Sequence, residues 1–178
     1  MPLPLPAHHT PAPDARSLRI ALGRFATGVT FITAALDGDP AGLIVNSFTS
    51  VSLEPPLVAF CPSRSSLTWS RMRQAERFGV NVLGRAHERF VARAAPPGAD
   101  RFAGLDWEPG CTGVPLLADA IACLECEIAA VHTAGDHWIV VGHVLHHHST
   151  GDEEPLIFYA SGFRSLRVPV RGIRRGAR

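Results

Sequence analysis

Lysine is absent from this sequence of 178 residues, and all 17 basic residues are arginine. Without a lysine amine the chain has no side chain for Schiff-base chemistry, whereas arginine suits two-point contact with a phosphate. The formal net charge is only +1, which argues against a protein that binds nucleic acid by neutralising its phosphate backbone. We therefore expect no nucleic-acid partner.

Long apolar runs are also missing, and cysteine is scarce. No stretch approaches the roughly 18 apolar residues that a membrane span needs, and no apolar signal-peptide core follows a basic start. We therefore expect a cytoplasmic protein with no membrane partner. Four cysteines are too few for a disulfide scaffold at this length, so free thiols are expected at Cys61, Cys111, Cys123 and Cys126.

With 46% hydrophobic residues, the chain can build one domain around one core. Residues 1–16 are rich in proline and alanine, and proline recurs too often there for a helix, so they are predicted to form a flexible N-terminal arm. The predicted domain covers residues 17–167. Residues 168–178 form an arginine-rich C-terminal tail, and fraying is expected from Arg164 onward.

Apolar residues at helical spacing predict three helices, and β-branched or apolar runs predict the strands. Either Ser65 or Ser66 can cap the second helix. The helices are predicted from Ser17 to a C-cap at Gly28, from Trp69 to Phe78, and from Ala86 to Ala94. The strands are predicted at Val29–Leu36, Gly42–Val45, Leu57–Cys61, Gly79–Leu83, Ala122–Val131, His137–Leu145 and Leu156–Tyr159.

Turn residues at Asp37–Pro40 join the first two strands into a hairpin. Many short strands with few helices argue against a doubly wound sheet, because each parallel pair needs a long crossover connection. The pattern favours a mainly β protein, an antiparallel β-barrel with peripheral helices. No GxGxxG motif follows a strand, so a Rossmann fingerprint is not supported.

Two polar segments could bind a ligand. Residues 46–52 place one amide and four hydroxyls directly after an apolar strand, where they can act at the rim of a barrel or simply satisfy their own turn. Residues 61–68 combine hydroxyls and an arginine before a predicted helix, which favours a phosphate, although a plain capping segment has the same composition.

Three other patterns carry less weight. Cys123 and Cys126 have the CxxC spacing of redox or zinc sites, but no second CxxC occurs, and strand alternation sends residues three apart to opposite faces. Consecutive histidines at 146–148 diverge along a strand, so no metal site is expected there or with His143. The absence of a GxSxG elbow leaves acyl transfer without support.

Several segments in the same order together resemble the flavin reductase-like family, most closely the reductase components of aromatic and steroid hydroxylases. The similarity covers residues 17–167 and implies a split β-barrel homodimer with flavin at or near the subunit interface. The segments that carry it are Leu22–Thr30, Asn46–Val58, Asn81–Leu83, Phe102–Trp107, Gly135–His137 with Gly142, and Pro155–Tyr159.

The resemblance also implies roles for individual residues. Beside the flavin ring and ribityl chain it puts Ala41, Gly42, Leu43, Ile44, Asn46 and Ser47, and nearer the phosphate it puts Cys61, Pro62, Ser63, Leu67, Thr68 and Arg93. On the nicotinamide side it puts His137, as the catalytic residue, with Tyr159, Gly162 and Phe163. Taken alone, Arg93 is typical of a solvated helix face, His137 of a structural or surface histidine, and Tyr159 and Phe163 of core packing. Asn46 stands where some relatives have glutamine.

The function implied by the resemblance is an NAD(P)H:flavin oxidoreductase that reduces FMN or FAD and supplies a partner flavin-dependent monooxygenase. The flavin would carry the redox chemistry, and no protein nucleophile is needed. Two alternatives stay open at this stage: a flavoprotein whose bound flavin reduces another acceptor, and a non-enzymatic flavin-binding protein. The sequence does not distinguish FMN from FAD, or NADH from NADPH.

Overall fold

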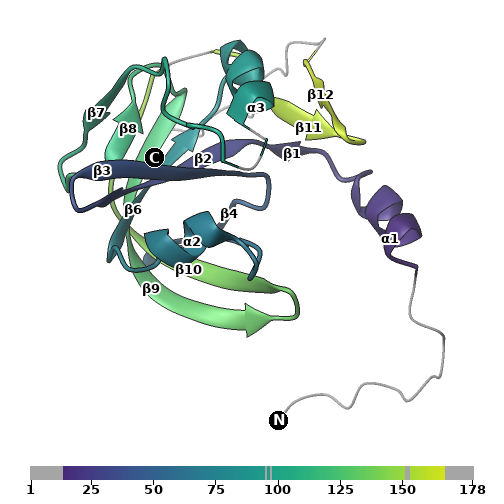
Figure 1. Cartoon of the computed structure of the whole chain (residues 1–178), viewed down its shortest axis with the longest axis horizontal. Coiled ribbons are helices and arrows are strands. Elements are labelled where there is room, and N and C mark those ends of the chain that lie inside the picture. The colour runs from purple at the N-terminus through teal and green to yellow at the C-terminus, as the bar shows by residue number, and fades with distance from the viewer. Residues whose placement is uncertain (1–13, 95, 97, 151–152, 167–178) are drawn as a thin grey trace, which may run out of the picture.

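A computed structural model describes residues 14–94, 96, 98–150 and 153–166, and within them the chain is mainly β. One antiparallel sheet of seven strands, in the order β3-β2-β6-β9-β10-β5-β4, curls into a barrel (Figure 1). A three-stranded sheet, β1-β11-β12, and a hairpin, β7-β8, lie outside it. The predicted split antiparallel barrel with peripheral helices is confirmed.

The helices are α1 (Ala15–Leu22), α2 (Leu67–Met72) and α3 (Glu88–Ala94), the last preceded by a 3-10 turn at Arg85–His87. The strands of the large sheet are β2 (Thr30–Leu36), β3 (Asp39–Val45), β4 (Thr49–Leu53), β5 (Pro56–Phe60), β6 (Arg77–Val82), β9 (Ala122–Ala134) and β10 (His137–Ser149). The remaining strands are β1 (Thr27–Gly28), β7 (Trp107–Pro109), β8 (Pro115–Leu117), β11 (Ile157–Tyr159) and β12 (Gly162–Arg164).

Two apolar clusters form the core, and β9 contributes side chains to both. Cys123 belongs to the cluster under α3, and Cys126 belongs to the cluster under α2. Both side chains are fully buried, and burial raises the pKa of the Cys123 thiol to about 11 and that of the Cys126 thiol to about 12. The prediction that strand alternation puts these two cysteines on opposite faces is confirmed.

The turn between β2 and β3 uses the residues that the sequence predicts. Asp37 and Gly38 both have positive φ, at 52° and 91°, the backbone geometry that a tight two-residue hairpin requires. Ala160 and Ser161, between β11 and β12, adopt the same region at 48° and 61°. Neither is glycine or asparagine, so this second turn holds backbone strain.

A buried carboxylate fixes the turn of the β7–β8 hairpin. Glu125 on β9 is 4% exposed. It accepts hydrogen bonds from the backbone N–H of Cys111 at 3.0 Å and from both the N–H and the hydroxyl of Thr112 at 2.6 Å. Burial alone would raise the pKa of Glu125, but these hydrogen bonds and the nearby charge of His146 lower it.

The first helix differs from its prediction at both ends. It begins at Ala15 instead of Ser17, because the side chain of Asp14 accepts a hydrogen bond from the backbone N–H of Ser17 and caps it. It ends at Gly23 instead of Gly28 because the chain there turns into β1. Residues 1–13 of the predicted arm and residues 168–178 of the predicted tail lie outside the described residues.

The second helix is shorter than predicted. It stops at Met72, and Ser66, one of the two predicted caps, accepts from the N–H of Trp69 at 3.1 Å. The apolar spacing continued to Phe78 because Trp69, Met72 and Phe78 all pack into the cluster under α2, although Phe78 lies on β6.

Three segments predicted as irregular contain strands. Residues 46–52 include most of β4, an edge strand that pairs only with β5. The loop predicted after residue 96 contains β7, and Arg164, placed at the start of the frayed tail, ends β12. Polar edge strands lack the apolar alternation on which strand prediction depends.

In the described part of the chain, no helix has the length and apolar character needed to cross a membrane.

Candidate functional site

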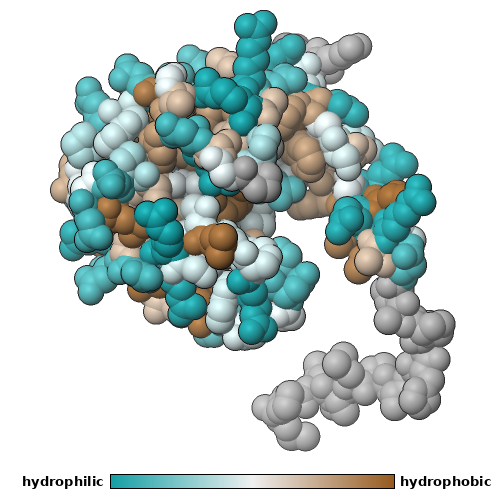
Figure 2. Space-filling view, in the orientation of Figure 1, coloured by the Kyte–Doolittle hydropathy of each residue, from teal (hydrophilic) through white to brown (hydrophobic). Residues whose placement is uncertain are grey.

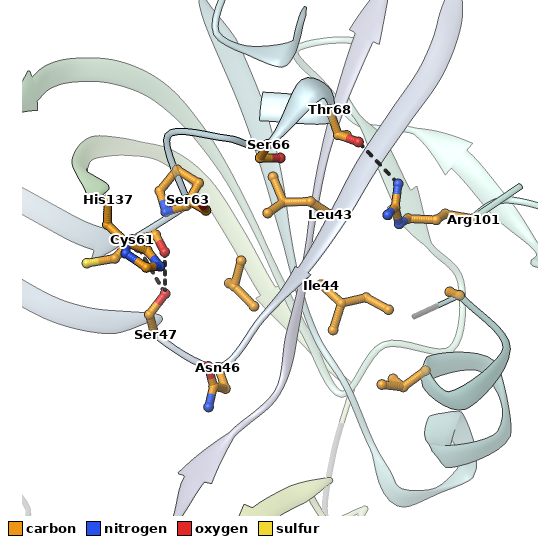
Figure 3. Close-up of a pocket in the computed structure, with 14 residues that line it drawn as sticks. Leu43, Ile44, Asn46, Ser47, Cys61, Ser63, Ser66, Thr68, Arg101 and His137 are labelled. Carbon is orange, nitrogen blue, oxygen red and sulfur yellow. Dashed lines mark hydrogen bonds between the residues drawn. The ribbon is translucent and has the colours of Figure 1, made fainter. Parts of the chain in front are cut away.

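A pocket of about 600 Å³ opens beside the end of β3. Its walls come from β3, from the segment between β5 and α2, from α3, from the loop before β7 and from the start of β10 (Figure 3). This volume is in the range of small-molecule sites. The lining residues are Leu43, Ile44, Val45, Asn46, Ser47, Cys61, Pro62, Ser63, Ser66, Thr68, Val91, Ala94, Arg101 and His137.

One wall is apolar, and Ile44, Val91 and Ala94 belong to it. Val91 and Ala94 are three residues apart on α3, so they share the helix face that packs on the core. Ile44 packs against the same cluster from β3. This wall offers van der Waals contact to a flat apolar ligand.

The opposite wall is a polar turn held by one hydroxyl. The Ser47 Oγ accepts a hydrogen bond from the N–H of Cys61 at 2.9 Å and lies 3.4 Å from the Cys61 carbonyl oxygen, to which it donates. These contacts join the end of β3 to the end of β5. Burial raises the pKa of the half-buried Cys61 thiol, so the neutral thiol is favoured at the pocket.

His137 lies at the same end of the pocket as Ser47 and Cys61 (Figure 3). Its Nδ1 is 2.7 Å from a carboxylate oxygen of Asp136, and the hydrogen bond from His137 lowers the pKa of that carboxyl. An ionised carboxylate can only accept, so Nδ1 carries the proton and Nε2 is left for a ligand. The side chain is 46% exposed, which leaves room for that contact.

The turn that carries His137 is fixed to the neighbouring polar segment. Ser63 and His137 form an isolated antiparallel bridge. The N–H of Trp138 donates to the Pro62 carbonyl at 2.9 Å, and the N–H of Arg64 donates to the Asp136 carbonyl at 2.9 Å. The two segments therefore form one wall.

Arg101 lies at the other end of the pocket, across Leu43 and Ile44 from His137 (Figure 3). Its Nη1 donates to the hydroxyl of Thr68 at 3.2 Å. Arg101 was not predicted as a site residue, because it lies in a loop without periodicity. The available signal was its position directly before the segment Phe102–Trp107, which was already part of the family resemblance.

Comparison with known proteins supports the resemblance. The family model for the flavin reductase like domain matches residues 22–167. The chain belongs to this family. The predicted resemblance to the flavin reductase-like family is therefore confirmed, and the pocket is the candidate active site of a family member.

Two curated relatives and one solved structure are similar to this family member over most of its length. The reductase subunit HsaB of a flavin-dependent monooxygenase from Rhodococcus jostii is 40% identical over 153 residues, covering 86% of this chain and 78% of the relative. The FMN reductase (NADH) SmoA from Agrobacterium fabrum is 43% identical over 163 residues, covering 89% and 92%. A homologue of nitrilotriacetate monooxygenase component B from Mycobacterium thermoresistibile is 36% identical and superposes with a TM-score of 0.85, covering 92% of each chain.

The pocket brings together eight of the residues to which the family resemblance gives a role beside flavin, and also His137. The eight are Leu43, Ile44, Asn46, Ser47, Cys61, Pro62, Ser63 and Thr68. It adds Val45, Val91, Ala94 and Arg101, for which the sequence predicted no part in the site, and Ser66, which was predicted as a helix cap within the polar segment 61–68.

The other predicted residues lie outside the pocket lining. Gly42 backs onto Phe31, where a Cβ would come within 2.4 Å of the ring, so its role here is close packing. Leu67 is 82% exposed. The guanidinium of Arg93 donates to the carbonyl of Ala103. Ala41 packs against the cluster under α2.

The predicted nicotinamide-side residues on β11 and β12 also lie apart from the pocket lining. The Tyr159 hydroxyl accepts from Arg24 at 3.4 Å. The Phe163 ring packs edge-on against Phe158, with centroids 5.7 Å apart. Gly162 faces the guanidinium of Arg164. Their predicted contact with nicotinamide stays a prediction.

Proposed function

We propose that this chain is an NAD(P)H:flavin oxidoreductase whose pocket binds FMN or FAD and which supplies reduced flavin to a partner monooxygenase. The observation that carries the proposal is the pocket itself, which has an apolar wall, an imidazole at one end and a guanidinium at the other, in a member of the flavin reductase-like family. An aromatic ring system with a phosphorylated tail fits these three features.

In the proposed arrangement the flavin ring lies near Asn46 and Ser47, with Ile44 against its face. The turn at 61–63, which the family resemblance puts nearer the phosphate, lies at the ring edge in this arrangement. The lining at this end offers an amide, a thiol and hydroxyls, together with backbone groups, for hydrogen bonds to the polar ring edge. Bound flavin would accept a hydride from nicotinamide, and the chain would orient the two rings.

His137 is proposed to position the nicotinamide. Asp136 holds the imidazole by its Nδ1–H, so Nε2 can accept one hydrogen bond from the N–H of the carboxamide. Hydride transfer moves no proton through the imidazole, so this role is orientation and electrostatics instead of acid–base catalysis. Replacing His137 by alanine should lower kcat/KM for NAD(P)H about tenfold, equivalent to about 1.4 kcal/mol of transition-state stabilisation.

The proposed partner follows from the relatives. HsaB is named as the reductase subunit of a flavin-dependent monooxygenase, and SmoA as an NADH-dependent FMN reductase. By analogy, this chain would deliver reduced flavin to a separate oxygenase.

A homodimer is part of the proposal, and α1 supports it. None of the residues of α1 is buried, and its large apolar side chains face solvent: Ile20 is 58% exposed and Leu22 is 66% exposed. Phe25, just after the helix, is 78% exposed. The helix stands out from the barrel beside the β11–β12 turn, with apolar side chains on its surface (Figures 1 and 2). A second copy would bury this surface. Sedimentation showing only a 19.1 kDa species at micromolar concentration would contradict the dimer.

One experiment tests the proposed activity against both alternatives. Oxidation of NADH and NADPH is followed with and without added FMN or FAD. Turnover only with added flavin supports the proposal. Turnover by a protein that copurifies with flavin favours a bound prosthetic group, and flavin binding without NAD(P)H oxidation favours a non-enzymatic protein.

The His137→Ala variant adds a test of the site. Stopped-flow flavin reduction across NAD(P)H concentrations gives kcat/KM, and a flavin titration of the same variant is the control. Unchanged reduction kinetics would show that His137 does not contribute to nicotinamide binding or flavin reduction. Loss of flavin binding would instead show that His137 acts in flavin binding and not in nicotinamide binding.

A further inference from the structure

We infer that Arg101 binds the phosphate of the flavin, and that Arg93 acts as a positioning residue that fixes the loop carrying Arg101. The inference rests on the proposed flavin-binding function, because it names the residue that recognises the phosphate in the same pocket. It assigns phosphate contact to a residue that the family resemblance did not identify.

Among the described residues, no carboxylate pairs with the guanidinium of Arg101, so its charge is available to a ligand. It is half-buried and lines the pocket, and its one side-chain hydrogen bond among the described residues goes to the neutral hydroxyl of Thr68. The adjacent carboxylate, Asp100, is occupied by its own loop, where it accepts from the N–H of Phe102 at 2.9 Å and of Ala103 at 3.2 Å. Since arginine has five N–H donors, most of those of Arg101 remain for a phosphate.

One hydroxyl lies beside Arg101, and a second lies between the two ends of the pocket (Figure 3). Thr68 lines it, and because its oxygen accepts from Arg101, its proton is left to donate. The Ser66 oxygen likewise accepts from the N–H of Trp69, so its proton is available too. A guanidinium with a neighbouring O–H donor is complementary to phosphate oxygens, whereas an uncharged ribityl chain would not neutralise the guanidinium.

Arg93 faces the loop instead of the pocket. Its neighbours on α3, Val91 and Ala94, line the pocket, but the guanidinium of Arg93 donates to the carbonyl of Ala103 and lies against Gly104. Gly104 has a φ of +68°, a conformation that glycine adopts without strain. Arg93 and Asp100 therefore hold residues 100–104 from two sides, which sets the direction of Arg101.

The inference is tested by FMN and riboflavin titrations of the unmodified protein and of Arg101→Gln, Arg93→Gln and the double variant. FMN and riboflavin differ only in the phosphate. Arg101→Gln should weaken FMN binding about ten- to hundredfold, the worth of a buried charged hydrogen bond, and leave riboflavin binding within about twofold. Added salt should weaken FMN binding less in this variant.

The double variant separates positioning from direct contact. If Arg93 acts only through Arg101, Arg93→Gln weakens FMN binding when Arg101 is present, and has no further effect in the Arg101→Gln background. Arg93→Lys, which can still donate to the Ala103 carbonyl, should restore much of the FMN affinity. Additive losses in the double variant would give Arg93 its own phosphate contact and overturn its role as a positioning residue.

Two further outcomes distinguish the inference from the function on which it rests. If Arg101→Gln weakens riboflavin and FMN equally, Arg101 does not contact the phosphate, and the inference fails while flavin binding stands. If the unmodified protein binds neither flavin, the proposed function fails, and the inference fails with it.

Discussion

Asn81 offers a stringent test of how this barrel is held together. Its side chain is fully buried on β6. The amide donates to the carbonyl of Phe31 at 3.0 Å and to the Thr33 hydroxyl at 3.3 Å. Its oxygen accepts from the N–H of Leu117 at 2.7 Å and from the Cys123 thiol at 3.4 Å. One side chain therefore joins β6 to β2, β8 and β9.

Replacing Asn81 by alanine should destabilise the protein by about 3 kcal/mol. The largest contribution comes from the Leu117 N–H, which loses its acceptor inside the protein, at a cost of roughly 1 to 3 kcal/mol. The donated hydrogen bonds contribute about 1 kcal/mol more, because Thr33 keeps its bond to the Pro115 carbonyl and only Phe31 loses a donor outright. In a domain of this size, such a loss lowers Tm by about 6 to 12 °C.

The assay is thermal unfolding followed by circular dichroism, and the chain provides a matched control. Asn46, the other asparagine in the sequence, is exposed at the pocket rim, so Asn46→Ala should change the free energy of unfolding by less than about 0.5 kcal/mol. If Asn81→Ala lowers Tm no further than Asn46→Ala does, the buried network does not hold the strands together.

Three more predictions address the pocket, the strained turn and the buried carboxylate. Saturating FMN should slow the reaction of Cys61 with a disulfide reagent at least severalfold while the exposed Cys111 reacts as before, since only the first lines the pocket. Ser161→Gly should raise stability by about 1 kcal/mol, measured as Tm, because glycine relieves the positive φ of 61°. The lowered pKa of Glu125 stabilises the fold above its ordinary value of 4.5, and this contribution is lost as pH falls through the lower folded value. Tm should therefore drop on acidification below about pH 4.5, and Glu125→Gln should reduce that dependence.

For each of these three predictions, a specific result would contradict the reasoning. Equal rates for Cys61 with and without FMN would mean that flavin binds elsewhere. An unchanged Tm for Ser161→Gly would mean that the turn relaxes at no cost. If Glu125→Gln leaves the acid side of the stability profile unchanged, other carboxyl groups control acid unfolding.

Structure was predicted most accurately where a backbone conformation admits only a few residue types. The turn at Asp37–Gly38 is an example, because its positive φ values select such residues. Prediction failed where a helix and the strand after it both place apolar residues in the same core. Phe78 on β6 continues the apolar spacing of α2, because both elements pack into one cluster, and the helix was therefore predicted too long. The strand at Thr49–Leu53 was missed because an exposed edge needs no apolar alternation.

The candidate site was predicted in part for a similar reason. Segments that follow β3 and β5 carry recognisable polar clusters, and most of their predicted residues do line the pocket. Arg101 could not be predicted from periodicity, because its direction is set by hydrogen bonds within a loop and by Arg93 from another element. Such contacts between distant segments appear only in the folded chain.

The tie between the β9–β10 turn and residues 62–64 has a consequence for protein engineering. Exposed hairpin turns are the usual places for a tag, a linker or an inserted domain. Here the Gly135–Asp136 turn is bonded through Arg64 and Trp138 to the pocket wall, and His137 follows it directly. An insertion at that turn would shift the imidazole and Ser63 together. The β2–β3 turn, whose residues do not line the pocket, is the better place to lengthen this chain.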